Sequence, residues 1–71
     1  MLIRYQTQDG KNHEQIFVGN PNISLFAELG NAECFLEAKG SQLKGATIYM
    51  DGRPQRSYAY TPEKGLHQTN P

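Results

Sequence analysis

Few side chains of this sequence could do covalent or acid–base chemistry, and their types and spacing do not form a recognised set. A cysteine can act as a nucleophile when a neighbouring base takes its proton, and the chain has one cysteine, Cys34, and two histidines, His13 and His67. Cys34 lies in an alternation of apolar residues, which favours a small core residue over a nucleophile. We therefore expect a protein that is not an enzyme.

Metal and cofactor chemistry has equally little support in the sequence. One cysteine and two distant histidines cannot build a zinc site without ligands from another chain. The sequence has no phosphate-binding loop and no dinucleotide motif, so we expect no metal and no cofactor. The glutamates Glu28, Glu33 and Glu37 indicate a solvated acidic patch that a basic partner could contact, since catalytic carboxylates need a cleft with an apolar wall.

Tyrosine and arginine side chains near the C-terminus form the main candidate binding site. A four-residue loop at 51–54 would pair residues 46–50 with residues 55–60, with Tyr49 opposite Arg56. Tyrosine and arginine are enriched in protein-binding hot spots, and both also stack on unpaired bases. The predicted binding residues on this strand face and its loop are Tyr49, Arg53, Arg56, Tyr58 and Tyr60.

Residues 1–17 predict a β-hairpin that would position a sheet beneath these side chains. Asp9 and Gly10 are typical of a two-residue turn, because both tolerate positive φ. That turn pairs Ile3 with Ile16 and separates an apolar face from a polar one. The apolar face then holds Ile3, Tyr5, Ile16 and Val18, and the polar face holds Arg4, Gln6, His13 and Gln15.

A helix is predicted after the hairpin, and Gly30 determines its length. Asn22 or Ser24 can cap its N-terminus. Gly30 follows an apolar helical residue, as a C-terminal glycine does, so we expect a two-turn helix over 23–29 and a strand over 32–38. The alternative is one long helix that reaches Lys39 and accepts Gly30 in its interior at a cost of about 1 kcal/mol.

These elements predict a single α+β domain over residues 1–61. Its antiparallel sheet has four or five strands, built from the N-terminal hairpin and a C-terminal meander, with one short helix on one face. The alternatives are a ββαββ arrangement with one long helix and a β-grasp-like fold, which has a similar order of elements. Residues 62–71 are expected to form a flexible tail. The expected core is Ile3, Tyr5, Ile16, Val18, Leu25, Leu29, Leu36, Ile48 and Met50.

Composition limits the classes of partner. The chain has 71 residues and a formal net charge of +0, and this balance favours a protein partner over nucleic acid. No apolar run approaches the roughly 18 residues of a membrane span. The function predicted is a small non-enzymatic protein-binding module, of adaptor or inhibitor type. The alternative is a module that binds single-stranded nucleic acid through the C-terminal hairpin.

Two further expectations follow from size and cysteine content. A core in a chain this short supplies little stability, and the sequence offers no disulfide or metal to supplement it. We therefore expect a symmetric homodimer, the commonest closed assembly. A lone cysteine, together with an N-terminus that lacks the pattern of a signal peptide, predicts the cytoplasm.

Overall fold

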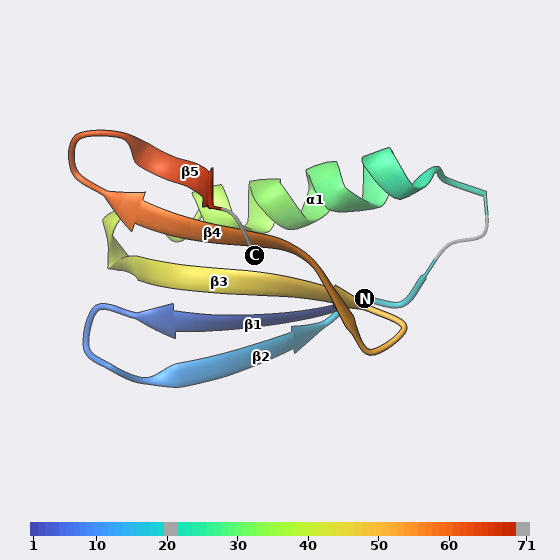
Figure 1. Ribbon diagram of the computed structural model, residues 1–71, viewed down its shortest axis with the longest axis horizontal. Coiled ribbons are helices and arrows are strands. Elements are labelled where there is room, and N and C mark those ends of the chain that lie inside the picture. The colour runs from blue at the N-terminus through green and yellow to red at the C-terminus, as the bar shows by residue number, and fades with distance from the viewer. Residues whose placement is uncertain (20–21, 70–71) are drawn as a thin grey trace.

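The computed structural model describes residues 1–19 and 22–69, which form one helix layer on a five-stranded sheet (Figure 1). The elements are β1 (Leu2–Thr7), β2 (Asn12–Ile16), α1 (Leu25–Glu37), the short 3₁₀ helix η1 (Gly40–Gln42), β3 (Leu43–Met50), β4 (Arg53–Thr61) and β5 (Gly65–Thr69). The sheet order is β2-β1-β3-β4-β5. The predicted α+β class, with a hairpin and a meander, is confirmed.

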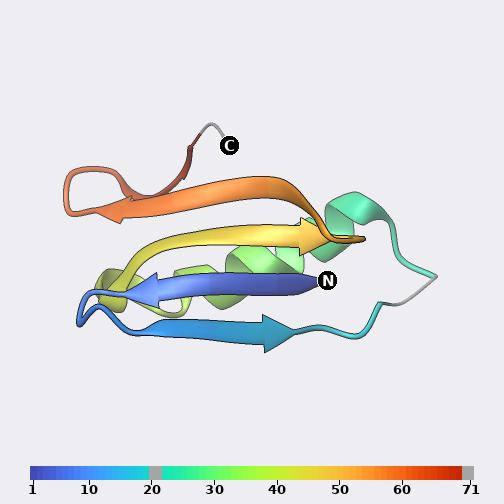
Figure 2. The ribbon, with the colours of Figure 1, turned by 60° about the horizontal axis from the view of Figure 1, so that its bottom comes forward.

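Every pair of neighbouring strands in the sheet is antiparallel. The β-grasp-like alternative is therefore wrong, because that fold places its first and last strands side by side in parallel. The helix covers one face of the sheet and leaves the other uncovered. Figure 2 shows the uncovered face toward the viewer, with α1 behind the strands.

The N-terminal hairpin forms as predicted, but its register differs by one residue. The Gly10 N–H donates to the Thr7 carbonyl at 2.9 Å, and Gly10 has a φ of 85°. These features define a three-residue loop that ends in a left-handed glycine, rather than a two-residue turn. Leu2 consequently lies opposite Ile16, and a one-residue slip exchanges the two faces of β2. The predicted burial of Ile16 and Val18 is wrong, since they are 72% and 94% exposed.

The single long helix is the alternative that forms, so the predicted two-turn helix and the strand over 32–38 are wrong. Ser24 caps α1, because its Oγ accepts the Ala27 N–H at 3.2 Å. Gly30 lies within the helix. Three residues of α1 form a buried stripe on the sheet, and their burial outweighs the roughly 1 kcal/mol that an interior glycine costs. The stripe consists of Leu29, Ala32 and Leu36.

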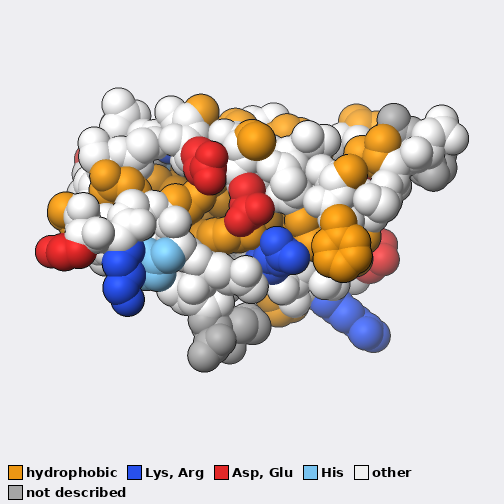
Figure 3. Space-filling model, turned by 90° about the horizontal axis from the view of Figure 1, so that it is seen from above, with side chains coloured by type: hydrophobic (Ala, Val, Ile, Leu, Met, Phe, Trp, Pro, Cys, Tyr) orange, Lys and Arg blue, Asp and Glu red, His pale blue; other side chains and the backbone are white. Residues whose placement is uncertain are grey.

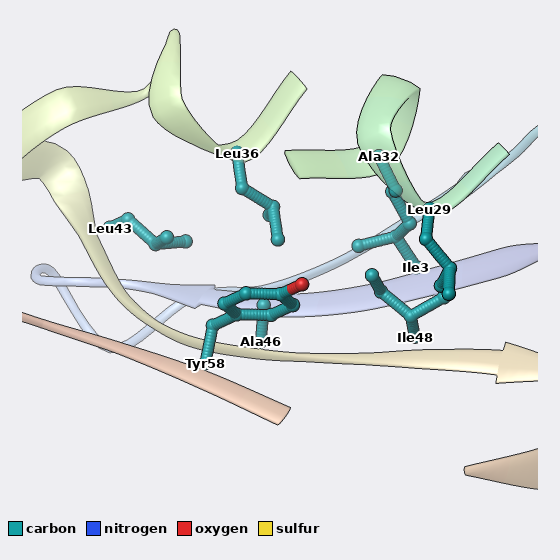
Figure 4. Packing of buried hydrophobic residues seen from close by; sticks show 8 residues of the cluster. All are labelled: Ile3, Leu29, Ala32, Leu36, Leu43, Ala46, Ile48 and Tyr58. Carbon is teal, nitrogen blue, oxygen red and sulfur yellow. The ribbon is translucent and has the colours of Figure 1, made fainter. Parts of the chain in front are cut away.

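Eight buried residues join the helix to the sheet, as Figure 4 shows from close by. They are Ile3, Leu29, Ala32, Leu36, Leu43, Ala46, Ile48 and Tyr58. Four of the expected core residues are among them, namely Ile3, Leu29, Leu36 and Ile48, while Tyr5 and Met50 pack at the edge of this cluster. Leu25, expected in the core, is 47% exposed: it continues the face of the buried stripe but is the first residue of α1.

The C-terminal hairpin also differs from its predicted register. Asp51 and Gly52 both have positive φ, 52° and 76°, which is typical of a two-residue turn. β4 therefore begins at Arg53 and includes Pro54, which lies opposite Tyr49 next to a shift in register. Tyr58 lies opposite Ala46. The strand pairing that a four-residue loop predicts therefore differs from the observed pairing by one residue along most of β3 and β4.

The sheet continues beyond residue 61, where the sequence predicts a domain boundary. β5 pairs antiparallel with β4, with Tyr60 opposite Leu66 and Ala59 opposite His67. Residues 65–69 thus belong to the sheet. In the described part of the chain, no helix is long and apolar enough to cross a membrane.

Candidate protein-binding surface

The five predicted binding residues do not share one face of the sheet. Tyr58 lies on the helix side, is 3% exposed and belongs to the core. Arg56 lies opposite the buried Ile48 and so also projects to the helix side. Tyr49, next to Ile48 in the same strand, projects to the uncovered side. The predicted common face is therefore wrong, because the register of β3 and β4 differs by one residue.

The other two predicted residues are divided in the same way. Arg53 is exposed at the start of β4. Tyr60 follows Tyr58 on the helix side and packs against the core cluster. On that side Figure 3 shows acidic and basic side chains together above apolar surface, rather than a purely acidic patch.

Tyr58 places a polar atom inside the core. Its hydroxyl is buried and has no hydrogen-bond partner among the described residues. Burial raises the pKa of the Tyr58 phenol above its ordinary value, Arg56 acts to lower it, and the charge of Glu33 acts to raise it. Tyr58 is consequently a core residue with an unsatisfied hydroxyl, and it is not available as a contact for a partner.

The uncovered side of the sheet contains a groove. One hollow of ≈ 700 Å³ lies at the hairpin end and is lined by residues that include Gln6, Asn12, Gly45 and Thr47. A second hollow of ≈ 400 Å³ is lined by Met1, Leu2, Arg4, Glu14, Ile16, Tyr49, Asp51 and Gly52. Arg4 and Glu14 line both hollows. We call the two hollows together the open-face groove.

Arg4 is held at the centre of the open-face groove by two neighbours. Its Nε donates to the Glu14 Oε1 at 3.0 Å, with both side chains 58% exposed. Its guanidinium carbon lies 5.3 Å from the centroid of the Tyr49 ring. Each of these exposed interactions is worth no more than about 1 kcal/mol. Together they favour a position of the Arg4 charge between Glu14 and Tyr49.

Four apolar side chains border the same part of the groove, namely Met1, Leu2, Ile16 and Tyr49. Of the groove residues, the sequence prediction includes Tyr49 and misses Arg4, Glu14, Leu2 and Ile16 as a group. The signal lay in the length of the first loop. A three-residue loop puts Leu2 opposite Ile16 and Arg4 opposite Glu14, all on one face.

A second polar cluster lies at the tip of the first hairpin. The Thr7 Oγ1 donates to the Asp9 carboxylate and lies 3.2 Å from the His13 Nε2. With the Thr7 proton on Asp9, the His13 Nε2 is placed to donate to the Thr7 oxygen in the tautomer that carries a hydrogen there. The Thr7 hydroxyl and the Lys11 backbone N–H lower the pKa of Asp9.

Other candidate groups also lie apart from one another. His13 is stacked on Tyr5, with ring centroids 4.9 Å apart, so its predicted place on the polar face is wrong. Cys34 is exposed, which corrects its assignment to the core. Among the described residues, no three His, Cys, Asp or Glu side chains are grouped to hold a metal ion.

Comparison with known proteins does not place the chain in a group: no family model, curated protein or solved structure matches it.

Proposed function

We propose that the protein is a small non-enzymatic protein-binding module, of adaptor or inhibitor type, that contacts its partner with the open-face groove. The proposal rests on one observation: apolar and aromatic side chains border an ion-paired arginine on a sheet face that α1 does not cover. Aromatic residues and arginine are enriched in protein interfaces. Tyr49 is the predicted binding residue that this surface includes.

The geometry of Arg4 supports recognition of a polar group on the partner. The guanidinium group has five N–H donors in a fixed plane, and the Nε donor is directed to Glu14. Holding the group in place before binding lowers the conformational entropy that binding would otherwise remove. Burial of Leu2, Ile16 and Tyr49 would supply the apolar part of the binding free energy.

The absence of enzymatic activity is part of the proposal. At the hairpin tip, the Thr7 hydroxyl and the Lys11 N–H both donate to the Asp9 carboxylate. These hydrogen bonds join residues of one turn, and we assign them to stabilising that turn.

Single-stranded nucleic acid is the second candidate ligand. One observation favours it: Tyr49 and Arg4 are stacked on an uncovered antiparallel sheet face, where bases can stack on aromatic side chains. The formal net charge of +0 favours the protein partner, because sequence-independent binding of nucleic acid depends on basic surplus.

Affinity capture from the source cells with matched variants tests the proposal. Tyr49→Ala removes the aromatic ring beside Arg4. Phe26→Ala is the control, because it removes an aromatic ring that is 76% exposed on α1. We expect a partner protein that wild type and Phe26→Ala retain and Tyr49→Ala loses by about tenfold or more. Equal retention by all three proteins would contradict the proposal.

A titration with labelled single-stranded oligonucleotide, at two salt concentrations, separates the two ligands. We expect no saturable binding. Tight binding that weakens with salt and is lost in Tyr49→Ala would instead establish the nucleic-acid alternative.

Location and assembly complete the proposal. The cytoplasm is supported by the cysteine content, since a single cysteine cannot form a disulfide within the chain. A homodimer is supported by the small size of the core, which has eight buried apolar residues in the described chain.

A further inference from the structure

The two edges of the sheet differ in how well they are protected. β5 forms one edge and contacts η1, and Figure 1 shows it turned out of the plane of the other strands. β2 forms the other edge and runs straight beside β1 in both ribbon views. Natural edges are commonly protected by proline, lysine or strong twist. The sequence Asn12–Ile16 has neither proline nor lysine.

The hydrogen bonds of β1 and β2 show which backbone groups point away from the sheet. The Thr7 N–H donates to the Lys11 carbonyl at 3.0 Å, and the Phe17 N–H donates to the Met1 carbonyl at 2.9 Å. The odd-numbered residues of β2 are therefore bonded to β1. Since antiparallel bonding alternates along a strand, Asn12, Glu14 and Ile16 direct their N–H and C=O groups outward.

We infer that two copies of the chain pair antiparallel through β2, about a two-fold axis at Gln15, and form one continuous ten-stranded sheet. In this register Glu14 lies opposite the partner's Ile16, and the two Gln15 side chains face each other. An amide is both donor and acceptor, so it can bond to its own copy across the axis. An axis at Glu14 would oppose two carboxylates, which is unfavourable.

Three observations favour a second copy over a foreign strand. Ile16 and Val18, which are 72% and 94% exposed, stand at the end of β2, and two-fold pairing brings the two Ile16 side chains close together. The net charge of +0 gives no repulsion between copies. Pairing of β2 with β2 closes as a dimer, the commonest assembly, whereas pairing of β2 with β5 is head-to-tail and gives a ring or a filament.

This inference deepens the homodimer of the proposed function by assigning its contact to the backbone edge of β2. The Glu14 and Ile16 side chains, which border the open-face groove, lie along that contact. The two-fold axis is perpendicular to the sheet, so both copies present their open faces on the same side. The dimer would therefore offer two open-face grooves side by side to a partner.

Sedimentation equilibrium tests the dimer, with matched variants that remove exposed apolar side chains. Wild type should approach twice the chain mass of 8.0 kDa at high micromolar concentration. Ile16→Lys should weaken self-association by about tenfold or more, because burial of the isoleucine is lost and the edge acquires a charge. Phe26→Lys, on α1, should leave it unchanged. Far-ultraviolet circular dichroism of each variant checks that the fold is retained.

Cross-linking tests the register independently of that variant. In a Cys34→Ala background, Gln15→Cys places the two thiols at a non-hydrogen-bonded pair, whose Cα atoms lie roughly 4.5 Å apart, within reach of a disulfide. We expect rapid dimer formation under mild oxidation, and little for Gln68→Cys on β5. A mass of 8.0 kDa at all concentrations would overturn the inference. A dimer that is disrupted by Phe26→Lys alone would also overturn it. The same holds for a dimer that is cross-linked through Gln68→Cys alone.

Discussion

Replacing Gly30 with alanine should stabilise the protein. Gly30 lies inside the 13-residue helix α1, and a Cβ added there would meet no atom within 4 Å. Alanine is favoured over glycine in a helix interior by about 0.8–1.0 kcal/mol. For a domain of this size, that free energy raises the melting temperature by roughly 4–8 °C. Thermal unfolding followed by circular dichroism at the helix band measures the shift.

Gly52→Ala is the matched control for this change. A Cβ at Gly52 would also meet no atom within 4 Å, but Gly52 has a φ of 76° in the turn between β3 and β4. Alanine is strained there, and we expect a loss of stability of roughly 1 kcal/mol. The two substitutions thus differ in backbone conformation and not in available space.

The sign of the Gly30 effect distinguishes the two helix lengths. If the helix ended at Leu29, Gly30 would take the left-handed conformation of a C-terminal glycine, and alanine would lower the melting temperature. A lowered melting temperature for Gly30→Ala, with Gly52→Ala also destabilised, would refute the interpretation of α1 as one continuous helix.

Three further predictions concern the core and the hairpin tip. Tyr58→Phe removes a buried hydroxyl without a partner among the described residues, so urea unfolding should show equal stability or a gain of up to about 1 kcal/mol; a clear loss would contradict this. The pKa of Tyr58 is raised in the folded protein, so ionisation of the phenol lowers the free energy of unfolding. That free energy is unaffected by Tyr58 below the ordinary phenol value of 10.0 and falls as pH rises through the folded pKa. The phenylalanine variant should therefore lose less stability at alkaline pH. The pKa of Asp9 is lowered, so ionised Asp9 adds to the free energy of unfolding above the ordinary carboxyl value of 3.8, and this addition is lost as pH falls through the folded pKa. Thr7→Val should raise the pKa of Asp9 in a titration followed by NMR. An unchanged pKa would reject the Thr7 hydrogen bond as the cause. Leu36→Ala should lower the free energy of unfolding in urea by about 2–5 kcal/mol, since Leu36 is 0% exposed. Phe26→Ala, on the exposed side of α1, should change that free energy by less than about 0.5 kcal/mol. Similar effects of the two substitutions would contradict the assigned burial.

The turn chemistry of the sequence predicts both hairpins but does not determine their registers. Asp9 and Gly10 suit a two-residue turn and equally suit a three-residue loop that ends in a left-handed glycine. The two choices differ by one residue, and that residue decides which side of β2 faces the helix. The observed choice places His13 against Tyr5 under the helix. Packing of this kind is not visible in a local pattern.

The length of α1 illustrates a second limit. Gly30 by itself indicates a helix end, and only the burial of Ala32 and Leu36 on the sheet shows that the helix continues. Tertiary burial outweighs a local preference of about 1 kcal/mol.

Which side chains form the candidate site depends on the strand registers of the N-terminal and C-terminal hairpins. Tyr49 was predicted from composition, because tyrosine beside arginine is typical of binding surfaces. Its arginine neighbour is Arg4 on β1 rather than Arg56 on β4. This contact could not be predicted without knowing that β1 lies between β2 and β3.

Site-specific photo-cross-linking in the source cells tests most directly whether the open-face groove binds a protein. A photoreactive phenylalanine analogue replaces Tyr49, which borders the groove, and in a parallel experiment replaces the exposed Phe26 on α1. We expect a cross-link from position 49 to a protein other than a second copy of this chain, and none to that protein from position 26. Cross-links to such a protein from position 26 alone would contradict binding through the open-face groove.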